Sequence, residues 1–378
     1  MRRLLAILVP LLVVAVPAQA KAPAAPPARH LPAVQARAFL LVDGRTGAVL
    51  AARNESASLP IASITKLMTV RVALQRLRPA QVVRASKAAA AVGESTIGLD
   101  PDERISVSDL LEGALVQSAN DAADALADAA AHGGRAEFVA AMNAEAQRLG
   151  LTDSHFVRPD GLDAPGHVSS ARDVTRLARI EMRSPLIRRI VRQRTATIAS
   201  GQKLSTWNDL LSTFPGVFGV KTGHTGDAGW CEVAAATRDG VVLYATILGS
   251  PSRERRDADL SALLRYGFSF YGHAQVARAG HVVATAPTQY GRAPIELVAP
   301  RTVERLVRVD EPLTAQIVTP AVVALPVRKG QPLGRMVVRA GPKIIARTTL
   351  VARSDVARPS LFGRAEWYTG RAFDRLLP

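Results

Sequence analysis

Residues 60–77 read PIASITKLMTVRVALQRL, and the interpretation of the whole chain starts from this stretch. A break at Pro60 is followed by apolar residues at helical spacing, so we expect a helix over 64–77. Ser63 and Lys66 stand three positions apart at its start. On a helix that spacing puts both side chains on one face, one turn apart.

This Ser-x-x-Lys pair is chemically suggestive because a serine hydroxyl needs an adjacent base to act as a nucleophile. Lys66 accepts a proton only if its pKa falls well below the ordinary value of about 10.4. Burial, the positive end of the helix dipole and a second cation, Lys221, would all lower that pKa. If Ser63 begins the helix, its own N–H also points into the site as an oxyanion-hole donor.

A second motif, Ser118-Ala119-Asn120, precedes an alanine-rich helical segment. A turn at a helix start would let Ser118 relay a proton towards a leaving amine and let Asn120 hydrogen-bond a substrate amide. Taken alone, the motif is better explained as an ordinary helix N-cap.

A third motif, Lys221-Thr222-Gly223, lies at the end of an expected strand. There Lys221 would place a cation and Thr222 would donate to a terminal carboxylate. Gly223 would let a peptide substrate approach the backbone closely. Three motifs of these kinds, in this order along the chain, indicate an active-site serine with a lysine base.

Other common chemistries find no support in the sequence. The histidines His155, His167 and His224 are separated singles that form no Ser-His-Asp or metal-ligand pattern, so we predict neither a metal nor a cofactor. The lone Cys231 forms no intramolecular disulfide and reads as a small buried apolar residue.

The expected elements indicate two domains. The first shows strands, then helices, then strands and a helix, an α/β (α+β) arrangement rather than alternating βαβ units. Its strands are expected at 38–42, 48–52, 219–222, 230–236 and 241–248, and its helices at 64–77, 106–131, 136–149, 171–182 and 260–270. After Gly272 short β-branched runs predict a small all-β sandwich. These runs are 276–279, 281–285, 295–298, 303–309, 315–318, 322–326, 334–339 and 343–351.

The two ends of the chain predict its location. A basic start, an apolar run and Ala18-Gln19-Ala20 indicate a signal peptide, so we expect an exported, periplasmic protein. A basic amphipathic helix over 360–378 suggests peripheral attachment to the outer face of the cytoplasmic membrane. Its alternative is a helix that packs on the β domain. The predicted segments are 1–20 signal peptide, 21–36 extended leader, 37–272 catalytic domain, 273–359 β domain and 360–378 helix.

The formal net charge is +16, and the part from Gly272 onward carries 16 Lys and Arg against 7 Asp and Glu. Nucleic acid is a poor partner for an exported chain without a recognition motif. Anionic lipid headgroups or an acidic wall polymer suit this charge better.

At this point the chain resembles the low-molecular-mass penicillin-binding proteins, which are serine D-alanyl-D-alanine carboxypeptidases with a C-terminal β domain. The resemblance covers roughly 36–377 and rests on more than the three motifs. The other matching stretches are GVKTGHT at 219–225, GLD at 161–163, SSARD at 169–173, RDA at 256–258 and PVRKG at 326–330. Arg158 departs from the family, which usually has Asn there, so no role is carried onto it.

The resemblance implies a serine β-lactamase/DD-peptidase-like fold and a role for each motif residue. Ser63 would be acylated by a peptidoglycan stem peptide and by β-lactam antibiotics, with Lys66 as base. Ser118 would assist proton transfer. Substrate would be held by Asn120, Lys221, Thr222, Gly223, the His224 backbone N–H, which completes the oxyanion hole, and Arg256.

Three alternatives remain open from the sequence. An endopeptidase that cuts cross-links would use the same residues. A class A β-lactamase shares the motif types but usually has Asp at the position of Ala119 and needs a Glu-bearing loop, whereas the turn over 158–173 offers only Asp. A non-catalytic wall-binding protein would not need an intact set of motifs.

Overall fold

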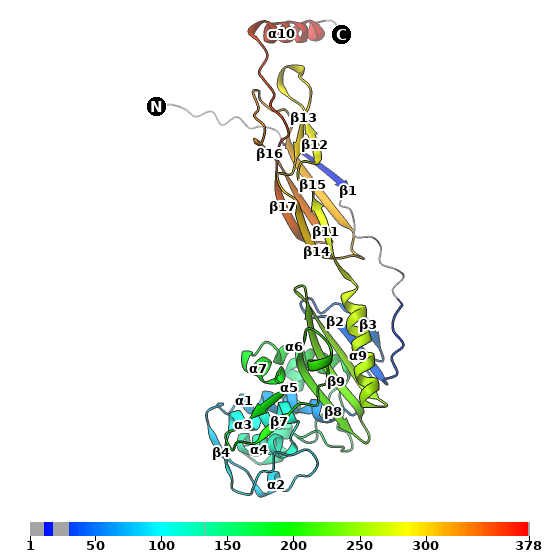
Figure 1. The fold of residues 1–378 in the computed structure, drawn as a ribbon, viewed down its shortest axis with the longest axis vertical. Coiled ribbons are helices and arrows are strands. Elements are labelled where there is room, and N and C mark those ends of the chain that lie inside the picture. Colours follow the sequence, from blue (N-terminus) through cyan, green and yellow to red (C-terminus); the bar gives the residue numbers. More distant parts are fainter. Residues whose placement is uncertain (1–10, 18–29, 132, 377–378) are drawn as a thin grey trace. The chain divides into compact units, whose positions relative to one another are not determined.

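The computed structural model describes residues 11–17, 30–131 and 133–376, and the chain divides into two compact units (Figure 1). One unit is Arg29–Ser269 and the other contains β1 (Leu11–Pro17) and the chain from Phe270 onward. The sequence analysis placed the boundary after Gly272.

A five-stranded antiparallel sheet forms the framework of the first unit. Its order is β3-β2-β10-β9-β8, with β8 at an edge. The strands are β2 (Ala38–Asp43), β3 (Val49–Arg53), β8 (Val217–Thr225), β9 (Gly229–Arg238) and β10 (Val241–Ser250). All five were expected from the apolar runs, although β8 is longer than predicted at both ends.

Helices cover both faces of this sheet. Side chains alternate between the two faces along a strand, so each strand contacts helices on either side. On one face α9 (Arg253–Phe268) packs so closely that a Cβ at Gly267 would lie 2.7 Å from the Leu243 side chain. On the other face α6 (Ala171–Glu181) contacts β10, where Thr175 and Thr246 hydroxyls lie 2.6 Å apart. The α/β prediction is confirmed.

The large core of the unit lies on the α6 side, between the sheet and a helical cluster. Helix α1 is buried almost completely and contacts α4, α5 and α6. The cluster contains η1 (Ala62–Thr65), α1 (Lys66–Leu74), α2 (Lys87–Ala90), α3 (Val107–Glu112), η2 (Gly113–Gln117), α4 (Asn120–Ala130), α5 (Arg135–Leu149), α7 (Pro185–Val191) and α8 (Leu210–Thr213). Two small hairpins, β4–β5 (Val82–Arg84, Arg104–Ser106) and β6–β7 (Thr195–Thr197, Lys203–Ser205), were not predicted.

Two predicted helices differ from the observed ones where the motifs lie. The helix over 64–77 begins as the 3-10 turn η1 and ends at Leu74. The helix over 106–131 is interrupted at Ser118, whose φ is 66°, after the π-helical turn η2. Periodicity alone does not reveal these breaks, because the apolar spacing continues through them.

The second unit is the predicted β domain. Its six-stranded sheet has the order β1-β15-β16-β17-β13-β12, and β11 pairs with β14 in a two-stranded ribbon. The strands are β11 (Tyr271–Ala277), β12 (Val282–Ala286), β13 (Ile295–Val298), β14 (Val303–Arg308), β15 (Leu313–Pro320), β16 (Pro332–Ala340) and β17 (Lys343–Ala352). An apolar cluster fills its interior.

The strand predicted over 322–326 is wrong. Val323 and Leu325 are buried, but the segment makes only an isolated bridge from Val323 to Thr288. Pro326 lacks the N–H that a ladder would need. Apolar alternation here reflects packing of an extended segment without sheet pairing.

The predicted signal peptide, 1–20, lies largely outside the described residues. Its described part, β1 (Leu11–Pro17), pairs antiparallel with β15. This pairing does not test the prediction, because a signal peptide is removed from the mature chain. At the other end, α10 (Leu361–Leu376) confirms a C-terminal helix. Among the described residues no helix is long and apolar enough to cross a membrane.

Candidate active site

Ser63 and Lys66 meet where η1 passes into α1. Lys66 Nζ lies 2.7 Å from Ser63 Oγ, as the spacing predicted. The ammonium also contacts Asn120 Oδ1 at 2.7 Å and the Asp160 carbonyl oxygen at 2.6 Å. A neutral amine that donates to these two oxygens has its lone pair left for the Ser63 hydroxyl proton.

The protein environment moves Lys66 towards that neutral form. The side chain is fully buried, and burial lowers the pKa of Lys66 to about 8. The carboxylates of Asp160, Asp124, Asp121 and Glu94 act in the opposite direction and limit the fall. Burial is therefore the dominant cause.

Ser118 and Lys221 form a second hydroxyl–amine pair. Lys221 Nζ donates to Ser118 Oγ at 2.7 Å and to the Thr222 carbonyl at 2.9 Å. Burial and then the charge of Lys66 lower the pKa of Lys221 well below its ordinary value. The left-handed backbone at Ser118 turns its hydroxyl towards β8 between η2 and α4.

Gly223 has a packing role that the sequence did not predict. A Cβ there would lie 2.8 Å from the Ile61 carbonyl oxygen and 3.0 Å from the Ser63 backbone nitrogen. The position is therefore packed against the turn that carries the nucleophile, and Gly223 lets β8 approach η1. That Gly223 also lets a peptide substrate approach the backbone closely stays a prediction.

Asn120 makes two hydrogen bonds within the protein. Its Oδ1 contacts Lys66 and its Nδ2 donates to the Gly93 carbonyl at 3.1 Å. These contacts position the lysine. Asn120 also lines the pocket, and its hydrogen bond to a substrate amide stays a prediction.

Arg256 projects from α9 towards β9 and is completely buried. Its guanidinium pairs with Asp257 at 2.7 Å and Glu232 at 3.1 Å. Burial raises the pKa of Glu232 to about 8, while Arg256 opposes that rise. Arg256 Nη1 makes no hydrogen bond in the described part of the chain, and the residue lines the pocket.

These groups surround a pocket with a volume of about 260 Å³. The predicted residues in its wall are Ser63, Ser118, Asn120, Thr222, Gly223, His224 and Arg256. Lys66 and Lys221 lie buried behind it. The sequence reading missed five wall residues, Glu94, Ser95, Leu162, Trp207 and Trp230. The ring of Trp230 lies 4.1 Å from that of His224, a contact set by the β8–β9 register.

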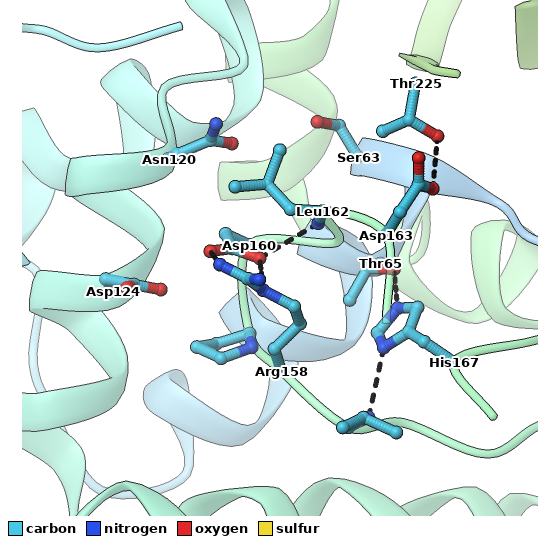
Figure 2. Close-up of polar contacts among 12 residues, drawn as sticks. Ser63, Thr65, Asn120, Asp124, Arg158, Asp160, Leu162, Asp163, His167 and Thr225 are labelled. Carbon is cyan, nitrogen blue, oxygen red and sulfur yellow. Dashed lines mark hydrogen bonds and ion pairs between the residues drawn. The ribbon is translucent and has the colours of Figure 1, made fainter. Parts of the chain in front are cut away.

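The turn that follows α5 supports the floor of the site (Figure 2). Thr225 Oγ1 donates to Asp163 Oδ1 at 2.6 Å, which ties this turn to the end of β8. His167 Nε2 lies 2.7 Å from Thr65 Oγ1, and burial lowers the pKa of His167 to about 4. Since the Val157 N–H donates to His167 Nδ1, the neutral ring donates from Nε2 to Thr65.

The described residues contain no group of three or more His, Cys, Asp or Glu side chains suited to a metal ion. Cys231 is buried, and burial raises the pKa of its thiol to about 11. A thiol in this state is a poor nucleophile, in agreement with the structural reading of Cys231.

Fold and site together define a serine acyl-transfer enzyme in which a buried lysine serves as base. Two family matches make the class specific. The family described as D-alanyl-D-alanine carboxypeptidase matches residues 21–252, and the family described as penicillin-binding protein 5, C-terminal domain, matches residues 271–358. The chain therefore belongs to the D-alanyl-D-alanine carboxypeptidase family, and it is a serine-type D-Ala-D-Ala carboxypeptidase.

Relatives agree across both domains. The D-alanyl-D-alanine carboxypeptidase DacF of Bacillus subtilis is 30% identical over 337 residues, 86% of each chain. The structure of penicillin-binding protein 5 from Haemophilus influenzae has a TM-score of 0.63 at 29% identity and covers 86% of this chain and 99% of its own. The Streptomyces K15 DD-transpeptidase gives a TM-score of 0.60 at 31% identity and covers 64% of this chain and 99% of its own.

Proposed function

We propose that Ser63 attacks the D-Ala-D-Ala peptide bond of a peptidoglycan stem peptide while Lys66 takes its proton. The observation that carries this assignment is the 2.7 Å contact between Ser63 Oγ and a buried Lys66 whose pKa is lowered to about 8. The acyl-enzyme forms as D-alanine leaves, and water then releases the shortened peptide.

Ser118 and Lys221 serve the leaving group in this proposal. The amine of the departing D-alanine needs a proton as the C–N bond breaks. The Ser118 hydroxyl, bonded to Lys221, is suited to deliver it from the pocket wall. Ser118 gives its hydroxyl proton to the amine and is reprotonated by Lys66, which took the proton of Ser63, so the number of protons balances.

Substrate binding is assigned to the edge strand β8, where Thr222, Gly223 and His224 line the pocket. An extended peptide adds to a free strand edge through backbone hydrogen bonds. Thr222, Lys221 and Arg256 would hold the terminal carboxylate by hydrogen bonding and charge. The backbone N–H groups of Ser63 and His224 would bind the oxyanion.

The assay for this function is release of D-alanine from diacetyl-Lys-D-Ala-D-Ala by the purified mature protein. We expect release that disappears in Ser63→Ala. Absence of release from the unaltered protein would support a non-catalytic wall-binding role instead. Benzylpenicillin should label Ser63 for minutes or longer, whereas turnover of many molecules per second would indicate a β-lactamase.

A cross-linked dimer distinguishes trimming from uncrosslinking. The proposed carboxypeptidase releases D-alanine from a pentapeptide monomer much faster than it cleaves the dimer. Preferential cleavage of the dimer would assign DD-endopeptidase activity to the same residues.

The location of the protein rests on its two ends, and we propose export to the periplasm with peripheral attachment to the cytoplasmic membrane. Helix α10 exposes Leu361, Phe362 and Tyr368, at 76%, 89% and 60% of their surfaces. Against this, Tyr290 makes edge-on ring contacts with Trp367 and Tyr368. Deleting 360–378 should leave D-alanine release unchanged and abolish cosedimentation with anionic lipid vesicles. Retained vesicle binding would contradict the anchor.

A further inference from the structure

An ion pair that the proposed mechanism does not use lies directly behind the base. Arg158 Nε and Nη2 each donate to one oxygen of Asp160, both at 2.6 Å. Figure 2 shows the guanidinium laid against this carboxylate. The Asp160 side chain is fully buried, whereas that of Arg158 is 32% exposed. A buried carboxylate with a two-pronged arginine contact has a fixed orientation.

The same aspartate touches both the base and the pocket wall. Its carbonyl oxygen accepts from Lys66 Nζ, and its Oδ1 also accepts from the Leu162 backbone N–H at 2.9 Å. Leu162 lines the pocket. Any rotation of the Asp160 turn would therefore shift the lysine and the wall together.

The charge of Asp160 would by itself hinder the base. A carboxylate near an amine favours the protonated ammonium, which accepts no proton. Among the charges that act on Lys66, that of Asp160 has the largest effect. Arg158 opposes this effect because its positive charge lies on the same carboxylate.

We propose that Arg158 is a positioning residue for the base: it holds the Asp160 turn against Lys66 and offsets the Asp160 charge. Lys66 then loses its proton at a lower pH than it would beside an unpaired carboxylate. This inference rests on the proposed role of Lys66.

The other charges around Lys66 do not depend on Arg158 in the same way. Helix α4 contributes Asp121 and Asp124, the loop after α2 contributes Glu94, and β8 contributes Lys221 on the far side of Ser118. Asp121 is occupied by the backbone N–H groups of Ile97 and Leu99.

Asp124 changes charge near neutral pH. Arg135 bonds its Oδ2 at 2.6 Å, whereas its Oδ1 is buried without a hydrogen bond in the described part of the chain. Burial raises the pKa of Asp124 to about 7, and the charge of Asp160 adds to that rise. The test below therefore includes a D124N background.

The test is the pH dependence of the second-order rate of acylation by benzylpenicillin, measured on the full chain. The rate should fall at low pH as Lys66 becomes protonated, and we call this part of the pH profile the acid limb. In Arg158→Gln we expect its midpoint to move up by about one pH unit, the smaller end of the effect of one close charge. In Asp160→Asn it should move down, since the amide still accepts from Leu162 but carries no charge. Both directions should persist in the D124N background.

Opposite shifts are a result that a merely structural role would not produce. The double variant R158Q/D160N should return the midpoint to near the wild-type value. Arg172→Gln, which breaks an exposed ion pair with Glu55, is the matched control and should not move it.

Two outcomes overturn different claims. A lower rate at every pH with an unmoved limb in Arg158→Gln would overturn the proposal alone. A limb that persists in Lys66→Gln would overturn the base assignment itself and the inference that rests on it. If Arg158→Gln fails to fold, judged by its thermal unfolding, the Asp160→Asn arm decides, and an unmoved limb there rejects the proposal.

Discussion

The two units of this protein have interiors of different chemistry. Among the described residues, the catalytic unit buries charged side chains of both signs, including Lys66, Lys221, Arg256 and Glu232. The β unit buries an apolar cluster, and its buried polar residues are the two threonines Thr288 and Thr319. Burying charge is unfavourable unless it is paired. The catalytic unit therefore holds its buried ionisable groups by pairing and hydrogen bonding, whereas the core of the β unit is apolar.

The largest effect should follow from removing the base. Lys66→Gln should lower the acylation rate by about a thousandfold, the usual scale for loss of a positioned general base. Leu350→Ala in the β core is the matched change, because Leu350 is also fully buried. It should destabilise the protein by about 3 kcal/mol and leave the acylation rate unchanged. A large rate loss in Leu350→Ala would break the division between the units.

The second effect is the pH dependence of acylation. Lys66 must be neutral to accept the serine proton, and its pKa is about 8. The rate should therefore rise with pH and level off above about 8, falling roughly tenfold for each unit below that value. Stopped-flow acylation between pH 5 and 9 measures this limb. A rate that is flat below pH 7 would contradict a lysine base.

The third comparison concerns ion pairs in the two units. Arg256→Ala leaves Glu232 buried without its cation and should lower the free energy of unfolding by about 3 kcal/mol. Arg353→Ala removes an ion pair with Glu296 whose side chains are 53% and 47% exposed. It should change the stability by less than about 1 kcal/mol. Urea unfolding of both variants measures these losses of stability. Equal losses would contradict the expected difference between the buried and the exposed ion pair.

The smallest effect compares two glycines. Gly223→Ala should slow acylation by about tenfold, because the new Cβ meets Ile61 and Ser63 backbone and overpacking costs about 1–3 kcal/mol. Gly330→Ala in the β unit has open space around it but a φ of +82°. It should cost about 1 kcal/mol of stability and no acylation rate. Unchanged acylation in Gly223→Ala would mean that the turn at Ser63 adapts.

Much of the fold and of the active site follows from local sequence. The Ser63–Lys66 contact is set by three residues of helical chain, and the five strands of the sheet follow from short apolar runs, as do most of the strands of the β unit. These signals act over a few residues, so periodicity and spacing capture them. The order of the three motifs then indicated a serine site with a lysine base, and the resemblance supplied the class of enzyme.

Contacts between distant segments were beyond the sequence. The break at Ser118, the packing of Gly223 on Ser63, the internal engagement of Asn120 and the Arg158–Asp160 pair behind Lys66 all join segments that lie far apart in the chain or that share no periodic signal. Burial, which sets the pKa of Lys66, is likewise a property of the folded whole. Local sequence specifies which groups can react and on which elements they lie. Which of these groups touch, and in which protonation state, follows from the tertiary packing, because both depend on how completely the packed domain excludes water.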